Sequence, residues 1–337
     1  MLQYLFKRLI LGLITLLVIL AVSYLLLRLA PGDPTKSNVL SMDSSVGTVN
    51  SEKSDLQNNN SIREELYLDK PIFYGFAMWL GKVVRYGDFG RSVTVDPGRP
   101  VTKLIMEKLP ATLYLNLLAI LLSYLIAVPS GIVSGYKINS FFDKSSSVIY
   151  FILYSLPGIW VAILLQVFFC EGGKFPIFPL RGLAVENSEN LTTWQIMSAT
   201  LFNSVLPVIC LSYGAIASLS RYARSSMAEV MNQEFIRTAR AKGASEFSVV
   251  INHAFRNSVI SLITLFSGIL PALIAGSVIV EYVFNIQGMG NLSLLALSSR
   301  DYPLQMALFF MTTFLSLLGL LIADLLYMLA DPRIKLN

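Results

Sequence analysis

The residues that could carry out covalent or metal chemistry are few in this chain and lie far apart in the sequence. Both cysteines, Cys170 and Cys210, fall in or at the edge of apolar runs and have no partner at metal-ligand spacing, which is typical of small hydrophobic residues. The single histidine, His253, cannot form a histidine cluster, and a serine triad would depend on this one residue in a strongly charged loop. We therefore predict that the chain is not an enzyme, has no catalytic residue and binds no metal or cofactor of its own.

Three ionisable residues lie inside long apolar runs, where a charge is costly and is by default a functional candidate. Arg28 stands at the end of the first run, near Asp33, and we expect it to reach the interface or to form a pair. Glu281 either lines a pathway or hydrogen-bonds a neighbouring helix, whereas Asp324 is expected to pair with a basic loop residue. For His253 we expect a place on a helix surface rather than a role in proton transfer.

Small residues gather in the same apolar run as Glu281. Gly268, Pro271, Gly276 and Ser277 permit close approach of helices, which suits either packing within a bundle or a narrow gate. Packing is the simpler interpretation, and together with Glu281 these residues form the candidate pathway-lining set. The sequence does not assign a substrate pocket.

The elements that must position these residues are membrane spans. Hydrophobic residues make up 54% of the 337 positions and charged residues 14%, against about 25% charged in an ordinary soluble domain. Apolar runs long enough to cross a hydrocarbon core of ~30 Å recur along the chain, which predicts an all-α, polytopic membrane protein with six transmembrane helices. The six runs are 9–29, 111–133, 147–169, 200–219, 259–284 and 303–329. For the first run a cleavable signal peptide is the alternative, but the apolar part of such a peptide is only about 7–15 residues long.

Basic residues in the short loops predict the orientation of the spans. They precede the first span, separate the second from the third and follow the sixth, and the positive-inside rule places these segments in the cytoplasm. The segment 221–256 between the fourth and fifth spans is also rich in basic residues, so both termini and this segment are predicted to be cytoplasmic. The basic residues of the short loops are Lys7, Arg8, Lys137, Lys144, Arg333 and Lys335. This distribution explains the net charge of +5 better than a nucleic-acid interface does.

The chain is predicted to have two parts. Residues 1–107 comprise the first span and a long external loop, whose Ser- and Asn-rich stretch 37–60 is predicted to be a mobile insert because it can bury little apolar surface. Residues 71–85 are rich in aromatic residues and end in basic ones, which suits an interfacial helix or, as the alternative, a helix packed on its own bundle. Residues 108–330 hold the remaining spans and a cytoplasmic segment, 221–257.

The cytoplasmic segment is longer than a turn between two spans requires, and its charged, helix-forming sequence indicates that something cytoplasmic docks there. Between residues 228 and 242, small or apolar residues recur at spacings of three and four, which predicts one face of an amphipathic helix. That face holds Ala228, Met231, Phe235 and Ala239, and another holds Glu229, Gln233, Arg237 and Arg240. Gly243 is predicted to end the helix, because glycine adopts the left-handed conformation without steric penalty, and Ser245 can cap the next one.

Several motifs resemble the permeases of binding-protein-dependent ABC importers, in the oligopeptide and dipeptide branch. Arg-Thr-Ala-Arg-Ala-Lys-Gly at 237–243, followed by His-Ala-Phe-Arg-Asn at 253–257, is similar to the cytoplasmic coupling segment of that family. The general family pattern is Glu-Ala-Ala, three residues, Gly, nine residues, Ile-x-Leu-Pro; this chain has Arg237 and Thr238 in place of Glu-Ala and 253–256 in place of the distal tetrad. These departures resemble the peptide branch. Further matches at 29–34, 68–72, 109–113 and 330–333 extend the resemblance over nearly the whole chain.

This resemblance implies a type I ABC importer permease fold, with 108–330 as the transmembrane type-1 domain, in a bacterial cytoplasmic membrane. It implies that the short helix around Phe235–Lys242, within the coupling segment 221–257, sits in a cleft of a cytoplasmic ATPase and couples ATP hydrolysis to alternating access. The partners it implies are a second homologous permease subunit, two cytoplasmic ATPase subunits that use ATP and Mg, an external substrate-binding protein and peptide cargo. The expected coupling residues are Glu234, Phe235, Arg237, Thr238, Ala239, Arg240, Lys242, Gly243 and Ala244.

The sequence gives less direct information on the source of energy and on the cargo than on the family. Gly172-Gly173-Lys174 lacks the spacing of a phosphate-binding loop, so ATP hydrolysis must come from a partner. The same machine could import nickel chelates or peptide-conjugated compounds, and the sequence does not decide among these cargoes. An ion-driven secondary transporter is a further alternative, disfavoured because Glu281 and Asp324 are the only acidic residues in the predicted spans. We expect a heteromeric permease pair, with a homomeric one left open.

Overall fold

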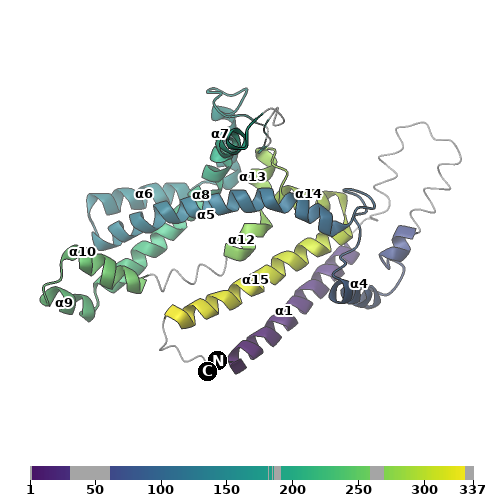
Figure 1. Ribbon diagram of the computed structural model, residues 1–337, viewed down its shortest axis with the longest axis horizontal. Helices are drawn as coiled ribbons and strands as arrows, with labels where there is room; N and C mark the ends of the chain where they lie inside the picture. The colour runs from purple at the N-terminus through teal and green to yellow at the C-terminus, as the bar shows by residue number, and fades with distance from the viewer. Residues whose placement is uncertain are drawn as a thin grey trace. The chain divides into compact units, whose positions relative to one another are not determined.

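A computed structural model describes residues 2–30, 61–180, 182–183, 185, 191–258 and 269–330, with side chains for all of these except 2–5, 270, 271, 275 and 326–330. Within these residues the fold is helical, as predicted, with two isolated β-bridges and no strand (Figure 1). In chain order the helices are α1 (Leu2–Leu29), α4 (Ile72–Tyr86), α5 (Val101–Tyr136), α6 (Phe141–Ser155), α7 (Gly158–Phe169), α8 (Thr193–Met231), α9 (Glu234–Ala241), α10 (Glu246–Ser248), the π-helix η2 (Val249–Phe255), α12 (Ile269–Ala275), α13 (Val278–Val283), α14 (Met289–Ser299) and α15 (Tyr302–Ala330).

Four of the described helices contain stretches long and apolar enough to cross a membrane. They are Phe6–Leu29, Val101–Tyr136, Thr193–Met231 and Tyr302–Leu325. The first span is one continuous helix, as predicted. The predicted fifth span, 259–284, falls partly outside the described residues, since 259–268 are not described and the remainder forms the short helices α12 and α13.

The predicted third span, 147–169, is not one straight helix. α6 and α7 form a pair bent by 94°, and only together do they have the length and composition of a span. The break lies at Pro157, which the chain uses as the N-cap of α7, while Leu156 is extended (φ −79°, ψ 127°). A residue before proline is disfavoured in the helical region, so the helix ends there. Counting this pair, the described residues contain up to five spans.

The chain divides into two compact units, each with its own core. Unit 1 comprises Met1–Pro110 and Asn291–Leu317, and unit 2 comprises Ala111–Gly290 and Leu318–Asn337. Helices α5, α14 and α15 each continue from one unit into the other.

Unit 1 is built around the contact of α1 with α4 and the first part of α15, which lies beside α1 in Figure 1. Leu20 and Tyr24 of α1 are buried against Trp79 of α4 and Met306 of α15. Helix α4 approaches α1 so closely that a Cβ atom on Gly75 would lie 2.4 Å from the Tyr24 hydroxyl. Helix α4 therefore packs on its own bundle, the alternative expected for this segment. Its other faces expose large apolar side chains, namely Phe73, Tyr74, Met78, Val84 and Tyr86.

Arg28 ties the end of α1 to the segment that precedes α4. Its Nη2 donates hydrogen bonds to the carbonyl oxygens of Leu68 (2.8 Å) and Lys70 (3.1 Å). Asp33, the partner considered from the sequence, lies outside the described residues. Arg28 thus has a structural role in this part of unit 1.

A buried carboxylate fixes the loop between α4 and α5 to the start of α15. Asp301 is fully buried, and its Oδ2 accepts hydrogen bonds from the Ser92 hydroxyl and from the backbone N–H groups of residues 93, 94 and 95, at 3.0, 3.1 and 3.2 Å. Its Oδ1 accepts from the N–H of Leu304 (3.2 Å), so the same side chain caps α15. Four donors on a single oxygen make this residue the anchor of the loop.

Unit 2 contains α5 from Ala111, the helices that follow it as far as Gly290, including the segment 221–257, and α15 from Leu318. The N-terminus of α8 carries a capping box, in which the side chains of Thr192 and Gln195 each bond the backbone of the other. Helix α8 then runs without interruption for 39 residues, through Pro207, to Met231. It therefore extends well beyond the predicted span 200–219 and leads directly to the residues predicted to be the coupling helix.

Candidate functional site

The predicted coupling helix is separate from the helix before it, and in this respect the prediction of one helix over 228–242 was wrong. Helix α8 ends at Met231 with Asn232 as its C-cap, Gln233 is extended (φ −80°, ψ 152°), and α9 begins at Glu234. This break changes the direction of the chain, so the phase of the apolar pattern is not continuous from α8 to α9.

The buried face of α9 consequently differs from the predicted one. Ile236 is fully buried and Ala239 is 7% exposed, and both pack against Met227 and Val230 of α8 and against Val249. Phe235, which the pattern had placed on the apolar face, is 37% exposed. Ile236 therefore holds α9 to the bundle, and the prediction of one continuous helix did not place it on the buried face.

The opposite face of α9 is open. It carries Glu234 and Arg237, whose side chains are 83% and 69% exposed and form an ion pair of 2.9 Å within the helix. Such an exposed pair adds little stability, so both charges remain available for contact with another molecule. Of the remaining predicted coupling residues, Thr238, Arg240, Lys242 and Gly243 are exposed and Ala244 is half-buried.

Helix α9 ends just before the glycine that the sequence predicts as its stop. Gly243 has φ +81°, its N–H donates to the carbonyl of Arg240 (2.9 Å), and the N–H of Ala244 donates to the carbonyl of Ala239 (3.2 Å). This pair of bonds is a Schellman motif, and Ala244 packs on the core that contains Ala239. The Ser245 side chain accepts a bond from the N–H of Ser248, so the predicted cap of the next helix is also confirmed.

A polar network holds the end of α9 to the end of α5. Arg240 donates from Nε and Nη2 to the two carboxylate oxygens of Glu246, at 2.9 and 3.2 Å, and the Tyr136 hydroxyl donates to Glu246 Oε2 at 3.0 Å. The Arg240 hydrogen bonds, followed by that of Tyr136, lower the pKa of the Glu246 carboxyl. Glu246 and Tyr136 were not among the predicted site residues, because nothing in the sequence links positions that lie so far apart.

The segment after α9 contains a second exposed aromatic residue and an unusual helix. Phe247 is 77% exposed and was not predicted from the sequence. Residues Val249–Phe255 form a π-helix, a rare element that is often found at functional sites. His253 lies on it and is partly exposed, which agrees with the expected place on a helix surface.

Helices α5, α6 and α8 are joined tightly near the candidate site. A Cβ atom on Gly131 would lie 2.6 Å from the carbonyl oxygen of Ser220, and one on Gly135 would lie 2.6 Å from that of Arg224. The backbones of α5 and α8 are therefore in contact, as in other Gly-x3-Gly contacts between membrane helices. Arg224 also donates from Nε and Nη2 to both carboxylate oxygens of Asp143 on α6, with an Nη2–Oδ2 distance of 2.8 Å.

Glu281, the main candidate for the pathway, is 2% exposed and hydrogen-bonds a neighbouring helix. The Thr112 hydroxyl of α5 donates to its Oε1 (3.0 Å) and accepts from the N–H of Met289 (2.7 Å). Gly276 (φ +68°) lies against this carboxylate, since a Cβ atom there would be 2.5 Å from Oε1. The Ser277 side chain caps α13. Gly268 and the side chain of Pro271 lie outside the described residues, so the lining of the pathway stays a prediction.

Two family models match the chain over most of its length. Residues 127–336 match the model described as binding-protein-dependent transport system inner membrane component, and residues 1–116 match the model for the N-terminal part of such membrane components.

Known proteins show the same similarity over the full length. The chain is 35% identical to the oligopeptide transport system permease protein AppB of Bacillus subtilis, over 99% of this chain and 100% of that protein. It is 34% identical to a putative peptide transport system permease protein of Brucella abortus, over 95% of each. It is 31% identical to the inner membrane ABC transporter permease protein YejB of Escherichia coli O157:H7, over 98% of each.

Proposed function

Because the chain belongs to the family of binding-protein-dependent transport system inner membrane components, we propose that it is a permease subunit of an ATP-driven peptide importer. It is a multi-pass protein of the cytoplasmic membrane, and its family is one of transport permeases rather than of enzymes. Two of the relatives named above are described as oligopeptide and peptide transport permeases, which favours peptides as the cargo. Nickel chelates and peptide-conjugated compounds are the alternative cargoes for the same machine.

The observation that carries the proposed mechanism is the geometry of α9. One face of this eight-residue helix is anchored by Ile236 and Ala239, and the other presents Phe235, Arg237 and their neighbours to the outside. A helix fixed on one side and exposed on the other can be held in a groove of a second protein. We assign this groove to a cytoplasmic ATPase, which would use ATP and Mg and supply the energy that this chain does not generate.

Movement of α9 would be transmitted because polar contacts join the helices around it. Helix α8, a candidate span, continues to the residue before the break that precedes α9, and the Arg224–Asp143 pair joins it to α6. The Arg240–Glu246–Tyr136 network joins α9 to α5. A force on α9 would thus move α5, α6 and α8 together, which is the rigid-body motion that alternating access requires.

The complete importer would contain two permease subunits, two ATPase subunits and an external substrate-binding protein. In this arrangement the chain has six spans, both termini and the 221–257 segment face the cytoplasm, and each permease forms half of the pathway. The second permease is expected to be a homologue rather than an identical copy. The external binding protein would carry most of the selectivity for cargo.

The docking of α9 on an ATPase can be tested by substituting residues on the exposed face of α9. The double variant Phe235→Ala/Arg237→Glu keeps Ile236 in place and should retain insertion and folding. It should reduce co-purification of the ATPase and peptide-stimulated ATP hydrolysis at least tenfold. Phe73→Ala, an exposed phenylalanine on α4, is the matched control and should change neither. Wild-type levels of ATPase association in the double variant would show that α9 is not the docking helix.

A further inference from the structure

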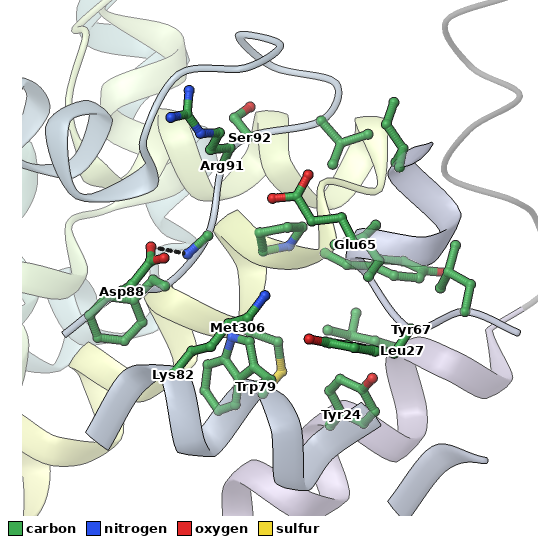
Figure 2. A pocket seen from close by; sticks show the side chains of 18 of the residues that line it. Tyr24, Leu27, Glu65, Tyr67, Trp79, Lys82, Asp88, Arg91, Ser92 and Met306 are labelled. Atoms are coloured by element: carbon green, nitrogen blue, oxygen red, sulfur yellow. Dashed lines mark hydrogen bonds between the residues drawn. The ribbon is translucent and has the colours of Figure 1, made fainter. Parts of the chain in front are cut away.

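Unit 1 contains a cavity of about 360 Å³ that belongs to neither the coupling segment nor the candidate pathway residues. It lies between the end of α1, the segment before α4, α4 itself, the loop after α4 and the start of α15 (Figure 2). Its walls include the aromatic residues Tyr24, Tyr67 and Trp79 and the apolar side chains of Leu27 and Met306. A volume of this size, with mainly apolar walls and a few polar groups, is typical of small-ligand sites.

Two buried nitrogen atoms of the described side chains have no hydrogen-bond acceptor, and both belong to residues that line this cavity. They are Trp79 Nε1 and Arg28 Nη1. The Nη2 atom of Arg28 already donates to two backbone carbonyls, so its orientation is fixed while Nη1 remains available. Buried donors are almost always satisfied, and two of them at one cavity indicate that an acceptor belongs there.

The charges around the cavity indicate the kind of acceptor. Lys82 Nζ lies 5.2 Å from the centre of the Tyr67 ring and makes no ion pair with a described residue. Figure 2 shows the Lys82 ammonium, the Tyr67 hydroxyl and the Glu65 carboxylate directed toward the same space. Arg91 and Asp88 also line the cavity, but each already bonds the backbone of its own loop. The free groups thus offer a cation and N–H donors for an anion, and one carboxylate for a cation.

We propose that this cavity binds a short peptide of two or three residues through its free carboxylate, an assignment that rests on the proposed function in peptide import. Lys82 and the Trp79 N–H bind the carboxylate, and the aromatic walls hold the adjoining apolar side chain. Glu65 meets the free amino group. The site would hold cargo on unit 1 at the stage before the cargo enters the pathway.

The experiment uses the full importer complex in nanodiscs of zwitterionic lipid, without the binding protein, and measures binding of tritiated Ala-Ala-Phe. Unlabelled Ala-Ala-Phe should compete at least tenfold better than its C-terminal amide, since the amide removes the charge that Lys82 binds. Lys82→Met should weaken binding at least fivefold, and Trp79→Phe, which keeps a ring but removes the N–H, about threefold. Lys103→Met, at an exposed lysine that does not line the cavity, is the matched control and should bind like the wild type.

The outcomes distinguish the proposed peptide site from the proposed function in peptide import. Equal competition by the acid and the amide, or unchanged binding in Lys82→Met, would overturn the peptide site, even where the complex still imports peptides with its binding protein. Loss of Ala-Ala-Phe binding on adding phosphatidylglycerol, with no recovery at high peptide concentration, would assign the cavity to a lipid headgroup and likewise overturn it. Failure of the complete wild-type complex to import any peptide would instead refute the proposed function.

Discussion

Removal of the Asp301 carboxylate is expected to release the loop between α4 and α5 from the start of α15. Its Oδ2 accepts from the Ser92 hydroxyl and three backbone N–H groups, and its Oδ1 accepts from Leu304. A buried donor left without an acceptor costs about 1–3 kcal/mol. Because the donors of Thr94 and Val95 are only partly buried, water can replace some of these bonds. We therefore expect Asp301→Ala to destabilise unit 1 by about 3–4 kcal/mol.

Asp301→Asn separates the two functions of the side chain. The amide keeps one oxygen and can accept either from the loop or from the N-terminus of α15, but not from both, so a loss of about 1–2 kcal/mol is expected.

The assay for both variants is amide hydrogen exchange at residues 92–95 in nanodiscs, together with the thermal midpoint. Since each 1.4 kcal/mol is a factor of ten, exchange should be roughly 100- to 1,000-fold faster in Asp301→Ala. Asp69→Asn is the control, because Asp69 is exposed and such substitutions change stability by less than about 0.5 kcal/mol. Exchange at 92–95 that is no faster in Asp301→Ala than in the control would refute the anchoring role.

Two further predictions concern the coupling region. Gly135→Val places methyl groups against the α8 backbone, where a Cβ atom alone would already lie 2.6 Å from the Arg224 carbonyl oxygen, and overpacking of this kind costs about 1–3 kcal/mol. We expect Gly135→Val to lower the thermal midpoint and to uncouple ATP hydrolysis from transport. The control is Gly12→Val, which has open space around it and should match the wild type. Equal thermal midpoints for Gly135→Val and the control would show that the close contact between α5 and α8 does not affect stability. The second prediction concerns pH. The hydrogen bonds from Arg240, and to a smaller extent that from Tyr136, lower the pKa of the Glu246 carboxyl. The contacts of Glu246 therefore contribute fully to stability above the ordinary glutamate pKa, and this contribution is lost as pH falls through the lowered pKa. The protection factors of the amides at 234–246, which are exchange rates corrected for the intrinsic effect of pH, should therefore be constant at neutral pH and fall only in acid, whereas Glu246→Gln should be less protected throughout. Identical protection in the variant and the wild type would contradict the network.

Much of the fold could be predicted from the sequence because local rules govern it. Long apolar runs gave the helices of the bundle, and the glycine stop at 243 and the cap at Ser245 follow from chemistry confined to a few neighbouring residues. The sequence also contains a signal for the bend between α6 and α7, namely Pro157, although the apolar run 147–169 by itself predicts one span.

The site was predicted less completely because its contacts join residues far apart in the sequence. The burial of Ile236 depends on the direction of α9 after the break at Asn232, which periodicity alone does not determine. Tyr136, Glu246 and Asp301 act through partners on other elements, so their spacing carries no local signal. The Gly-x3-Gly pair at 131 and 135 is the exception, since its pattern is local and visible in the sequence.

The side of the membrane on which α9 lies tests the central claim most directly. The two native cysteines are buried, so replacing both with alanine should give a background for a single new cysteine at Arg237, on the exposed face of α9. A membrane-impermeant maleimide should label Arg237→Cys in inside-out vesicles stripped of ATPase, fail to label it in right-side-out vesicles, and be blocked when purified ATPase is added back. Labelling from the outside, or labelling that the ATPase does not reduce, would contradict the account.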